Sequence, residues 1–386
     1  MIRGNTALKI LFVAFRDLKH PYSVGGDIYI NMIAKKLTEL GHEVTLLTTK
    51  FPGCKEKERD GNLRIVRLGN WLTMPIITFY YYTKFLKGKV DVIIEEILGG
   101  QRLPFLMATY AKEKIVGIWH QKHTEIFKRQ YPPFLASLLI FLERFLALLY
   151  RNKKIVANSK KTRSDLTRMG LRNSNIHIVY PGISDLFFNA QKLNNSDIRD
   201  REKSAVFLGK LRRYKMVHHL LYATKIVKKK IPDFTVIIAG KRSDVDPKYE
   251  AKLSSVINSL NLNDSVSFKW SISEEEKIRL LRKCMFLVLP SAIEGFGMVI
   301  IEANACGTPA IVSDRIPDDA LKHGYNGLRY PFGDIHALSV AMIKLLEDKK
   351  LWEKLSHNSL LWAQQFRWEY SAKKMDRIIR QVVSVD

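Results

Sequence analysis

Residues that form disulfides or bind soft metal ions are scarce in this chain. Cysteine occurs three times in 386 residues, at Cys54, Cys284 and Cys306. The three lie far apart, and none belongs to a Cys-x-x-Cys pair or a Cys/His cluster. The sequence therefore predicts neither a disulfide framework nor a zinc site, and a reducing compartment suits it.

Long apolar runs are also missing. No charge-free stretch reaches the ~20 residues that a membrane-spanning helix needs. The longest candidate, Phe134 to Tyr150, is interrupted by Glu143 and Arg144. The apolar stretch Ile10 to Phe15 is too short for a signal peptide and has no small-residue cleavage site after it. We expect a buried first strand there and a cytoplasmic protein.

Acidic residues are few relative to basic ones. The chain has 63 Lys+Arg against 38 Asp+Glu, a formal charge of +25, while 46% of its residues are hydrophobic. This composition excludes a disordered chain, a coiled coil and a collagen-like fibre. The basic excess indicates anionic partners such as nucleotide phosphates, anionic lipid or nucleic acid. A nucleic-acid-binding protein should interleave basic and aromatic residues on a recognisable module. None is visible, so we expect no nucleic-acid partner and keep this class as an alternative.

Strand-like and helix-like segments alternate along the chain in two successive runs. This alternation predicts an α/β fold with two doubly wound, Rossmann-like parallel sheets. Ligands of such folds bind at the carboxyl ends of the strands, so we expect two domains facing each other across a cleft. The predicted parts are an N-terminal domain at 1–188, a linker or surface loop at 189–203, a C-terminal domain at 204–365, and a helix at 366–386 that crosses back to the first domain.

The segment LPSAIEGFGMVIIEANACGTPAIVSD, from Leu289 to Asp314, carries the strongest chemical signal. An apolar strand ends, a glycine-rich loop follows, and a helix begins near Met298. Glycines allow close backbone approach, and the amides at a helix start suit a phosphate or sugar oxygen. Glu294 in the loop and Glu302 in the helix can both reach ligand hydroxyls. Two ordinary surface carboxylates explain the spacing equally well.

Two lysines, Lys210 and Lys215, follow a predicted strand and precede a helix, which is another place that suits phosphate. By themselves they fit a solvated basic loop better. Arg212 and Arg213 lie between them.

A glycine pair and a histidine mark the strand ends of the first domain. Gly25 and Gly26 lie between the first strand and the first helix, where their amides can meet an anionic or sugar ligand. His120 follows the predicted strand Ile115 to Trp119, and His123 is the alternative. A lone histidine is more often structural.

The motif Ser-x-x-Glu294-Gly-Phe-Gly-x4-Glu302-Ala-x-Ala-x-Gly-x-Pro resembles the signature of retaining, nucleotide-sugar-dependent family-4 glycosyltransferases with the GT-B fold. Four further segments resemble that family in the same order along the chain. They are Val24-Gly25-Gly26 with LGHEV, IVYPGISDLFF, FLGKLRRYK and HGYNGLRYPFGD.

The resemblance implies roles for individual residues. Glu302 would bind the ribose hydroxyls and Glu294 the donor sugar. Lys210 and Lys215 would bind the diphosphate, and His120 matches the family's active-site histidine. The remaining donor-binding candidates are Gly295, Phe296, Gly297, Met298, Val299, Gly25, Gly26, Arg212 and Arg213.

Three positions depart from the family pattern. Lys210 stands where arginine is usual. A lysine offers phosphate a single charged ammonium group in place of the two parallel donors of a guanidinium. Arg212 or Arg213 would have to supply the missing donors. Met216 replaces a glycine, and Pro181 replaces an asparagine.

The predicted function is retaining transfer of a sugar from a UDP- or GDP-sugar to a hydroxyl of a glycan or lipid-linked acceptor. We expect no cofactor and no metal, because lysines and a helix N-terminus can stabilise the departing diphosphate. A GT-B epimerase or phosphorylase is the alternative enzyme.

The run Phe134 to Tyr150 is preceded by Lys128-Arg129 and followed by Arg151, Lys153 and Lys154. An apolar helix with basic flanks can lie in a membrane interface, and it can equally be a core helix. Residues 1–185 hold 30 Lys+Arg against 15 Asp+Glu. This favours peripheral attachment to the cytoplasmic face of an anionic membrane.

Overall fold

A computed structural model describes residues 6–97, 103–189, 201–240 and 247–384 of the chain. The chain divides into two compact units. Unit 1 combines Met1–Gly182 with Trp368–Asp386, and unit 2 spans Ile183–Arg367. Most of the predicted linker, residues 190–200, lies outside the described residues.

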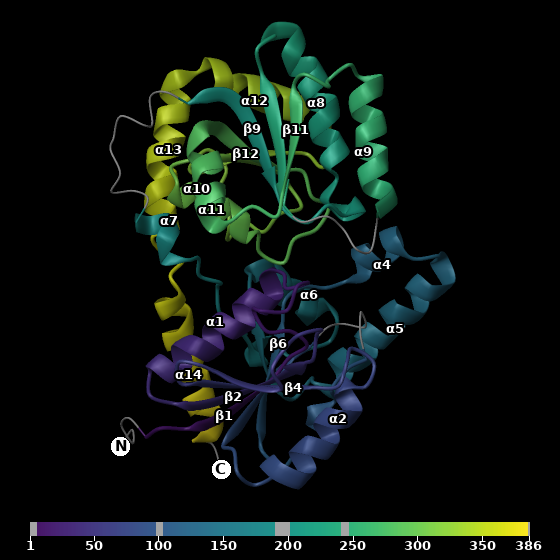
Figure 1. Ribbon diagram of the computed structural model, residues 1–386, viewed down its shortest axis with the longest axis vertical. Coiled ribbons are helices and arrows are strands. Elements are labelled where there is room, and N and C mark those ends of the chain that lie inside the picture. The colour runs from purple at the N-terminus through teal and green to yellow at the C-terminus, as the bar shows by residue number, and fades with distance from the viewer. Residues whose placement is uncertain (1–5, 98–102, 190–200, 241–246, 385–386) are drawn as a thin grey trace. The chain divides into compact units, whose positions relative to one another are not determined.

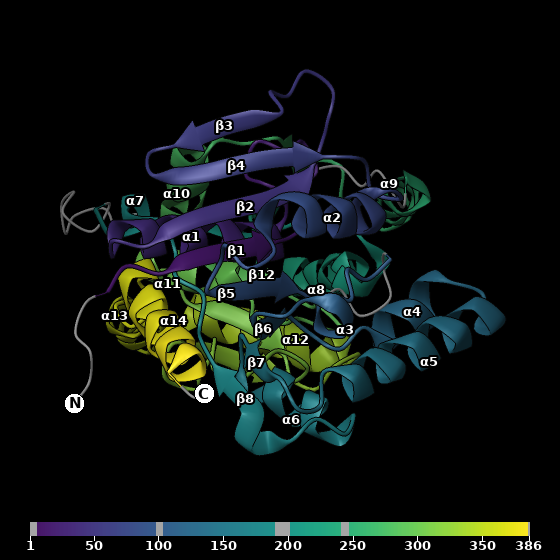
Figure 2. The same cartoon turned by 90° about the horizontal axis from the view of Figure 1, so that it is seen from below.

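Unit 1 is built on an eight-stranded sheet whose strands appear in spatial order in Figure 2. That order is β3 (Lys57–Asp60), β4 (Leu63–Leu68), β2 (Glu43–Thr49), β1 (Lys9–Val13), β5 (Val92–Glu96), β6 (Lys114–Trp119), β7 (Lys154–Ala157) and β8 (Ile176–Ile178). All neighbours from β4 to β8 pair in parallel.

The prediction of a purely parallel first sheet is wrong at one edge. Strand β3 pairs antiparallel with β4, with Asp60 opposite Leu63. The two strands are joined by Gly61-Asn62, and Gly61 has a φ of 60°, a conformation that glycine adopts at little cost. A short strand with four charged residues suits a solvated sheet edge.

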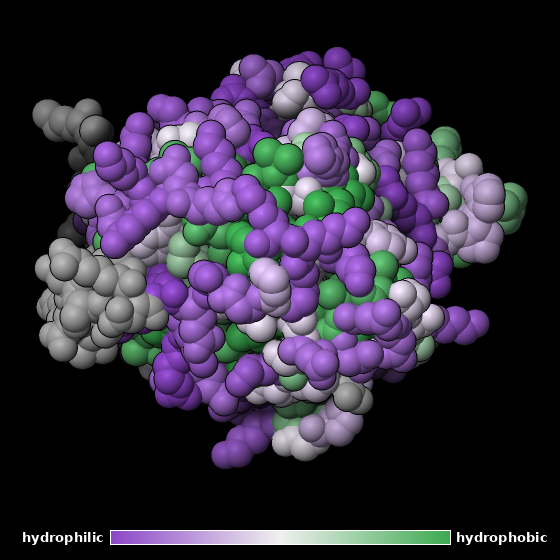
Figure 3. All heavy atoms as spheres, turned by 90° about the horizontal axis from the view of Figure 1, so that it is seen from above, coloured by the Kyte–Doolittle hydropathy of each residue, from purple (hydrophilic) through white to green (hydrophobic). Residues whose placement is uncertain are grey.

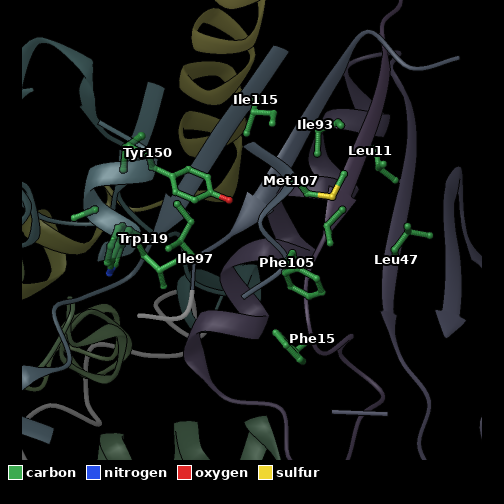
Figure 4. Close-up of a cluster of buried hydrophobic side chains, with 14 of the residues drawn as sticks. Leu11, Phe15, Leu47, Ile93, Ile97, Phe105, Met107, Ile115, Trp119 and Tyr150 are labelled. Atoms are coloured by element: carbon green, nitrogen blue, oxygen red, sulfur yellow. The ribbon is translucent and has the colours of Figure 1, made fainter. Parts of the chain in front are cut away.

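Helices cover both faces of this sheet, which is why its central strands read as continuous apolar runs. One face carries a large buried cluster that includes Leu11, Ile93, Trp119 and Tyr150 (Figure 4). The helices of unit 1 are α1 (Gly25–Glu39), α2 (Met74–Tyr81) continued by the π-helical turn Tyr82–Leu86, α3 (Met107–Tyr110), α4 (Thr124–Gln130), α5 (Pro133–Leu149), α6 (Lys160–Arg168) and α14 (Trp368–Val383).

The last helix, α14, packs against α1 within unit 1. Its apolar stripe is buried, and Trp368 meets the ring of Tyr29 edge to face at 6.1 Å. At the other end, Leu8 N donates to His42 Nδ1, which leaves His42 Nε2 to donate to Asp376 Oδ1 at 2.9 Å. The chain therefore returns from unit 2 to complete the core of unit 1.

Unit 2 contains a six-stranded parallel sheet, drawn in the upper part of Figure 1. Its order is β11 (Val266–Trp270), β10 (Thr235–Gly240), β9 (Glu202–Leu208), β12 (Cys284–Leu289), β13 (Ala310–Ser313) and β14 (Gly327–Tyr330). Its helices are α7 (Asp185–Asn189), α8 (Val217–Lys230), α9 (Pro247–Ser259), α10 (Glu274–Lys283), α11 (Met298–Ala305), α12 (Ile335–Glu347) and α13 (Lys349–Ala363).

Two predicted loops of unit 2 contain strand residues instead. Strand β9 begins at Glu202, inside the range predicted as linker, where Glu202 pairs with Cys284 of β12. The prediction missed this start because Glu202 and Lys203 are polar and exposed. The late segment HGYNGLRYPFGD contributes the edge strand β14, paired with β13. Polar composition suggested the linker at the first place, and the likeness of the second segment to a late loop of the family suggested a loop there.

The outer surface carries most of the charge. The face drawn in Figure 3 is predominantly hydrophilic, with smaller apolar areas between charged side chains. Among the described residues, no helix is both long enough and apolar enough to cross a bilayer.

Candidate active site

The glycine-rich loop of unit 2 runs from the end of β12 to the start of α11. Gly297 has a φ of 98°, and a Cβ there would lie 2.9 Å from Ile300 Cδ1. Only glycine meets both demands without strain. Helix α11 begins at Met298, so its first amides have no acceptor within the helix and point toward the loop.

Glu294 is held in this loop by two side chains. Ser291 Oγ donates to its Oε1 at 3.0 Å, and Lys215 Nζ forms an ion pair with the same oxygen. Both charged side chains are about 14% exposed. Burial alone would lower the pKa of Lys215, but the charge of Glu294 raises it above the ordinary lysine value. The structure thus joins two residues 79 positions apart into one charged pair.

Lys215 is positioned by a short 3₁₀ turn, Arg213–Lys215, that precedes α8. Met216 follows it in the left-handed conformation, with a φ of 51°. The family pattern has glycine here, and methionine adopts the backbone conformation that glycine favours. The departure at Met216 therefore leaves a tight turn in place.

The other basic candidates differ in burial. Lys210 and Arg212 are half-buried, whereas Arg213 is exposed. Arg212 is close enough that its charge lowers the pKa of Lys215.

Glu302 lies one turn into α11, and its side chain is 9% exposed. Lys277 of α10 donates to Glu302 Oε2 at 3.0 Å. Burial would lower the pKa of Lys277, and Glu302 outweighs that effect and raises it. The structure thus pairs a buried carboxylate with an ammonium group in the first part of the helix.

The remaining loop residues are placed as follows. Gly295 and Phe296 are buried, and the ring of Phe296 packs against Phe366 at 5.5 Å. Met298 and Val299 are half-buried at the first turn of α11. Phe296 thus anchors the loop.

In unit 1 the structure brings the glycine pair and His120 together. Gly25 and Gly26 open α1, and a Cβ on Gly26 would lie 3.1 Å from His120 Cδ2. Glu96 Oε1 lies 3.5 Å from His120 Nε2, without hydrogen-bond geometry. The ring of Tyr29 meets the imidazole edge to face at 5.5 Å. His120 is therefore enclosed, and its Nε2 makes no hydrogen bond to another described residue.

The alternative histidine, His123, has a structural role. Its backbone amide donates to Glu143 Oε1 at 2.7 Å, and its Nδ1 lies 3.1 Å from the same oxygen. Thr124 Oγ1 donates to Glu143 Oε2 at 3.3 Å. These contacts fasten α5 to the start of α4.

Three contacting residues escaped the sequence analysis: Lys277, Ser291 and Glu96. Lys277 follows a capping box in which Ser273 and Glu276 satisfy the first turn of α10. That signal places a helix start, but it says nothing about which carboxylate the lysine meets. In the described ranges, no three His, Cys, Asp or Glu residues converge as metal ligands.

Two family models match the chain. The model described as Glycosyltransferase Family 4 matches residues 24–185, and the model described as Glycosyl transferases group 1 matches residues 189–362. The chain belongs to the family-4, group 1 glycosyltransferases. The resemblance predicted from the sequence motifs is confirmed.

Relatives of this glycosyltransferase align over most of its length. Mannosylfructose-phosphate synthase of Agrobacterium fabrum is 24% identical, covering 91% of this chain and 85% of that protein. D-inositol 3-phosphate glycosyltransferase of Thermobifida fusca is also 24% identical, covering 89% and 86%.

Solved structures show the fold. Sucrose-phosphate synthase from Thermosynechococcus elongatus superposes with a TM-score of 0.79 at 20% identity, over 98% of this chain and 100% of that one. Anabaena HepE in complex with UDP and glucose gives 0.76 at 19% identity, over 97% and 100%. The glycosyltransferase thus has the predicted GT-B fold.

Proposed function

We propose that this glycosyltransferase moves a sugar from a nucleotide-diphosphate donor to an acceptor hydroxyl, with retention of configuration and without a metal ion. The observation that carries the proposal is the Lys215–Glu294 pair beside the first amides of α11. It combines a cation for a diphosphate, a carboxylate for sugar hydroxyls and a helix N-terminus in one place.

Donor binding would exchange partners within this cluster. The diphosphate competes for Lys215, with Lys210 and Arg212 as further cations, and Glu294 is released toward the sugar hydroxyls. In the same way, the ribose hydroxyls would donate hydrogen bonds to the carboxylate of Glu302, which Lys277 holds near the helix start. In unit 1, the groups that we expect to take part in the reaction are the imidazole of His120 and the backbone amides of Gly25 and Gly26.

Leaving-group stabilisation is the largest demand of such a transfer. Negative charge grows on the diphosphate as the sugar departs, and preorganised lysines and amides lower that barrier. Neither carboxylate of the β12–α11 region is reserved as a covalent nucleophile, since Glu294 serves sugar hydroxyls and Glu302 the ribose. The acceptor would then attack on the face that the diphosphate leaves, and the leaving phosphate would take the proton.

Stereochemistry and chelation test this mechanism. We expect proton NMR of the product to show the anomeric configuration of the donor, and turnover to persist in excess chelator. An inverted anomer would refute retention, and complete loss of turnover in chelator would refute metal independence.

Lys215→Ala tests the role of the pair. We expect kcat to fall more than donor affinity, because the diphosphate gains charge in the transition state. Lys229→Ala, an exposed lysine on α8, is the matched control. Equal kcat in the Lys215→Ala protein would remove this lysine from the reaction.

UDP-sugars are the donors to test first, since the solved complexes of Anabaena HepE contain UDP and UDP-glucose. A thermal-shift panel of UDP- and GDP-sugars identifies the donor, because a ligand that binds only the folded state raises Tm.

We further propose a lipid-linked or envelope-glycan acceptor and peripheral attachment to an anionic membrane surface through α5. This helix buries Glu143 together with Ala136, Leu146 and Ala147, and it leaves a row of large apolar side chains exposed to solvent. Phe134 is 83% exposed and Phe141 is 65% exposed. The full apolar face is Phe134, Leu135, Leu138, Phe141, Leu142, Phe145 and Leu148.

Vesicle flotation tests the attachment. The wild type should float with vesicles of phosphatidylglycerol and phosphatidylcholine, less so at high salt. The double substitution Phe141→Ser and Phe145→Ser should abolish flotation, whereas Leu361→Ser, an exposed leucine on α13, should not. Equal flotation of both variants would refute the role of α5.

A further inference from the structure

A basic pocket lies along the edge of the unit 1 sheet. It has a volume of about 560 Å³ and is lined by β8, the turn before it, α6 and α14. Within the part of the chain that the structure describes, no aspartate or glutamate lines it. Its charged and titratable lining residues are Lys160, Arg163, His177, Lys374 and Arg377. We call it the edge pocket.

Carboxylates near the edge pocket are committed to other cations. Asp376, beside Arg377 in sequence, binds Arg380 and His42. Asp165 on α6 pairs with Lys161 and Arg168. Two like charges therefore meet on α14 with no carboxylate lining the pocket between them.

The electrostatics of the pocket reflect this imbalance. Partial burial and the charge of Arg377 both lower the pKa of Lys374. Arg163 is oriented by neutral groups, since its Nε donates to Asn173 Oδ1 at 2.7 Å. Its planar fork is thus held in place while its charge is not cancelled.

His177 on β8 adds a buried donor. Its Nε2 is buried and has no hydrogen-bond partner among the described residues. The pKa of His177 is lowered. Burial is the largest cause, and the positive charges of Lys154, Arg163 and Lys374 lower the pKa further. A buried polar nitrogen without a partner is costly, and a bound oxyanion would supply the missing acceptor.

We propose that the edge pocket binds the phosphate group of a small phosphorylated ligand. A phosphate offers three acceptor oxygens, which suit one guanidinium fork, one imidazole and flanking ammonium groups. Ile176, Ile378 and the ring of Tyr180 line the rest of the pocket and suit an organic body.

The site is separate from the donor chemistry. None of its residues belongs to the loop of α11 or to the Lys215 turn. Its groups come from 160–177 and from 374–377, so it forms only when α14 is docked in unit 1. The inference therefore stands independently of the proposed transfer reaction.

Titration with inorganic pyrophosphate, followed by histidine NMR, tests the site. The ring signals of His177, assigned with His177→Gln, should shift saturably, and its pKa should rise, because an anion offsets the surrounding Lys and Arg charges. Replacing Lys374 and Arg377 by glutamine should weaken this response at least tenfold. Lys373→Gln, which removes one positive charge from an exposed site on the same helix outside the pocket, is the control and should leave the response unchanged.

A second experiment, flotation with lipid vesicles, identifies whether the phosphate comes from a free ligand or from a lipid headgroup. Flotation with phosphatidylglycerol vesicles that is lost in the double variant but kept in Lys373→Gln, without a pyrophosphate response, would assign the pocket to a lipid headgroup. Unmoved His177 signals together with equal flotation of both proteins would overturn the proposal. Pyrophosphate bound at the donor lysines does not interfere, because His177 reports on the edge pocket alone.

Discussion

At the scale of single residues, the chemistry of this glycosyltransferase depends on charges that are buried in pairs. Lysine and glutamate carry unfavourable desolvation when buried alone, and each offsets that cost for its partner. Lys215 with Glu294 and Lys277 with Glu302 follow this rule. Removing one member therefore affects both ligand binding and the partner left behind.

We predict that Glu302→Ala weakens binding of the free nucleotide. Two ribose hydroxyls lose a charged acceptor, which costs roughly 1.5–3 kcal/mol, or about 10- to 150-fold in affinity. Calorimetry measures the change, and circular dichroism checks that the protein stays folded. Glu353→Ala, on the surface of α13, is the control. Unaltered nucleotide affinity would show that Glu302 does not bind the ribose.

A second residue-scale prediction concerns pH. Burial raises the pKa of Glu95 to about 7, although Tyr150 donates a hydrogen bond to it. Below about pH 4.5 the carboxyl is protonated in both states. Above that pH, the unfolded protein loses the proton while the folded protein keeps it up to about pH 7. The free energy of unfolding therefore falls as pH rises toward 7.

Glu95→Gln should remove this loss, since glutamine stays neutral and its amide oxygen can still accept the hydrogen bond from the Tyr150 hydroxyl. The wild type should lose about 1.4 kcal/mol per pH unit from this group across the interval. Urea unfolding at pH 5 and pH 8 measures it, and the variant should be the more stable protein at pH 8. A wild-type advantage at pH 8 would contradict the prediction.

At the scale of elements, turns set where the charged side chains point. Met216 ends the 3₁₀ turn that carries Lys215 and holds a left-handed backbone, which costs a non-glycine residue about 1 kcal/mol. Met216→Gly should therefore be as stable as the wild type or more stable. Met216→Val should lose about 1 kcal/mol or more, because a branched Cβ fits this conformation poorly. Thermal unfolding of the three proteins gives the order, and a valine variant that is more stable than the glycine one would refute it.

At the scale of the whole molecule, unit 1 is assembled from both ends of the chain. Met375 on α14 is fully buried in unit 1. Met375→Lys should detach α14, so that limited proteolysis cuts within residues 1–182 faster than within 183–367. Lys373→Gln, two residues away and exposed, should leave the digestion pattern unchanged. Uniform cleavage of both units in the lysine variant would argue against a separate unit 1.

The amino-acid sequence by itself determined the local features of this protein. Strand–helix alternation, the glycine that α11 requires at Gly297, and the spacing of Glu294 and Glu302 are set within short stretches of chain. They sufficed to predict the α/β fold and the family. The charged edge strand β3 was not predicted, because its four consecutive charged residues resemble a loop.

Tertiary structure alone decided which side chains meet. Lys215 reaches Glu294, and Lys277 reaches Glu302, because the sheet order places α8 and α10 beside the β12–α11 loop. It also decided that α5 turns Glu143 inward and its phenylalanines outward, since His123 and Thr124 bind that carboxylate. Sequence spacing encodes periodicity along one element, whereas contacts between distant elements depend on the topology that joins them.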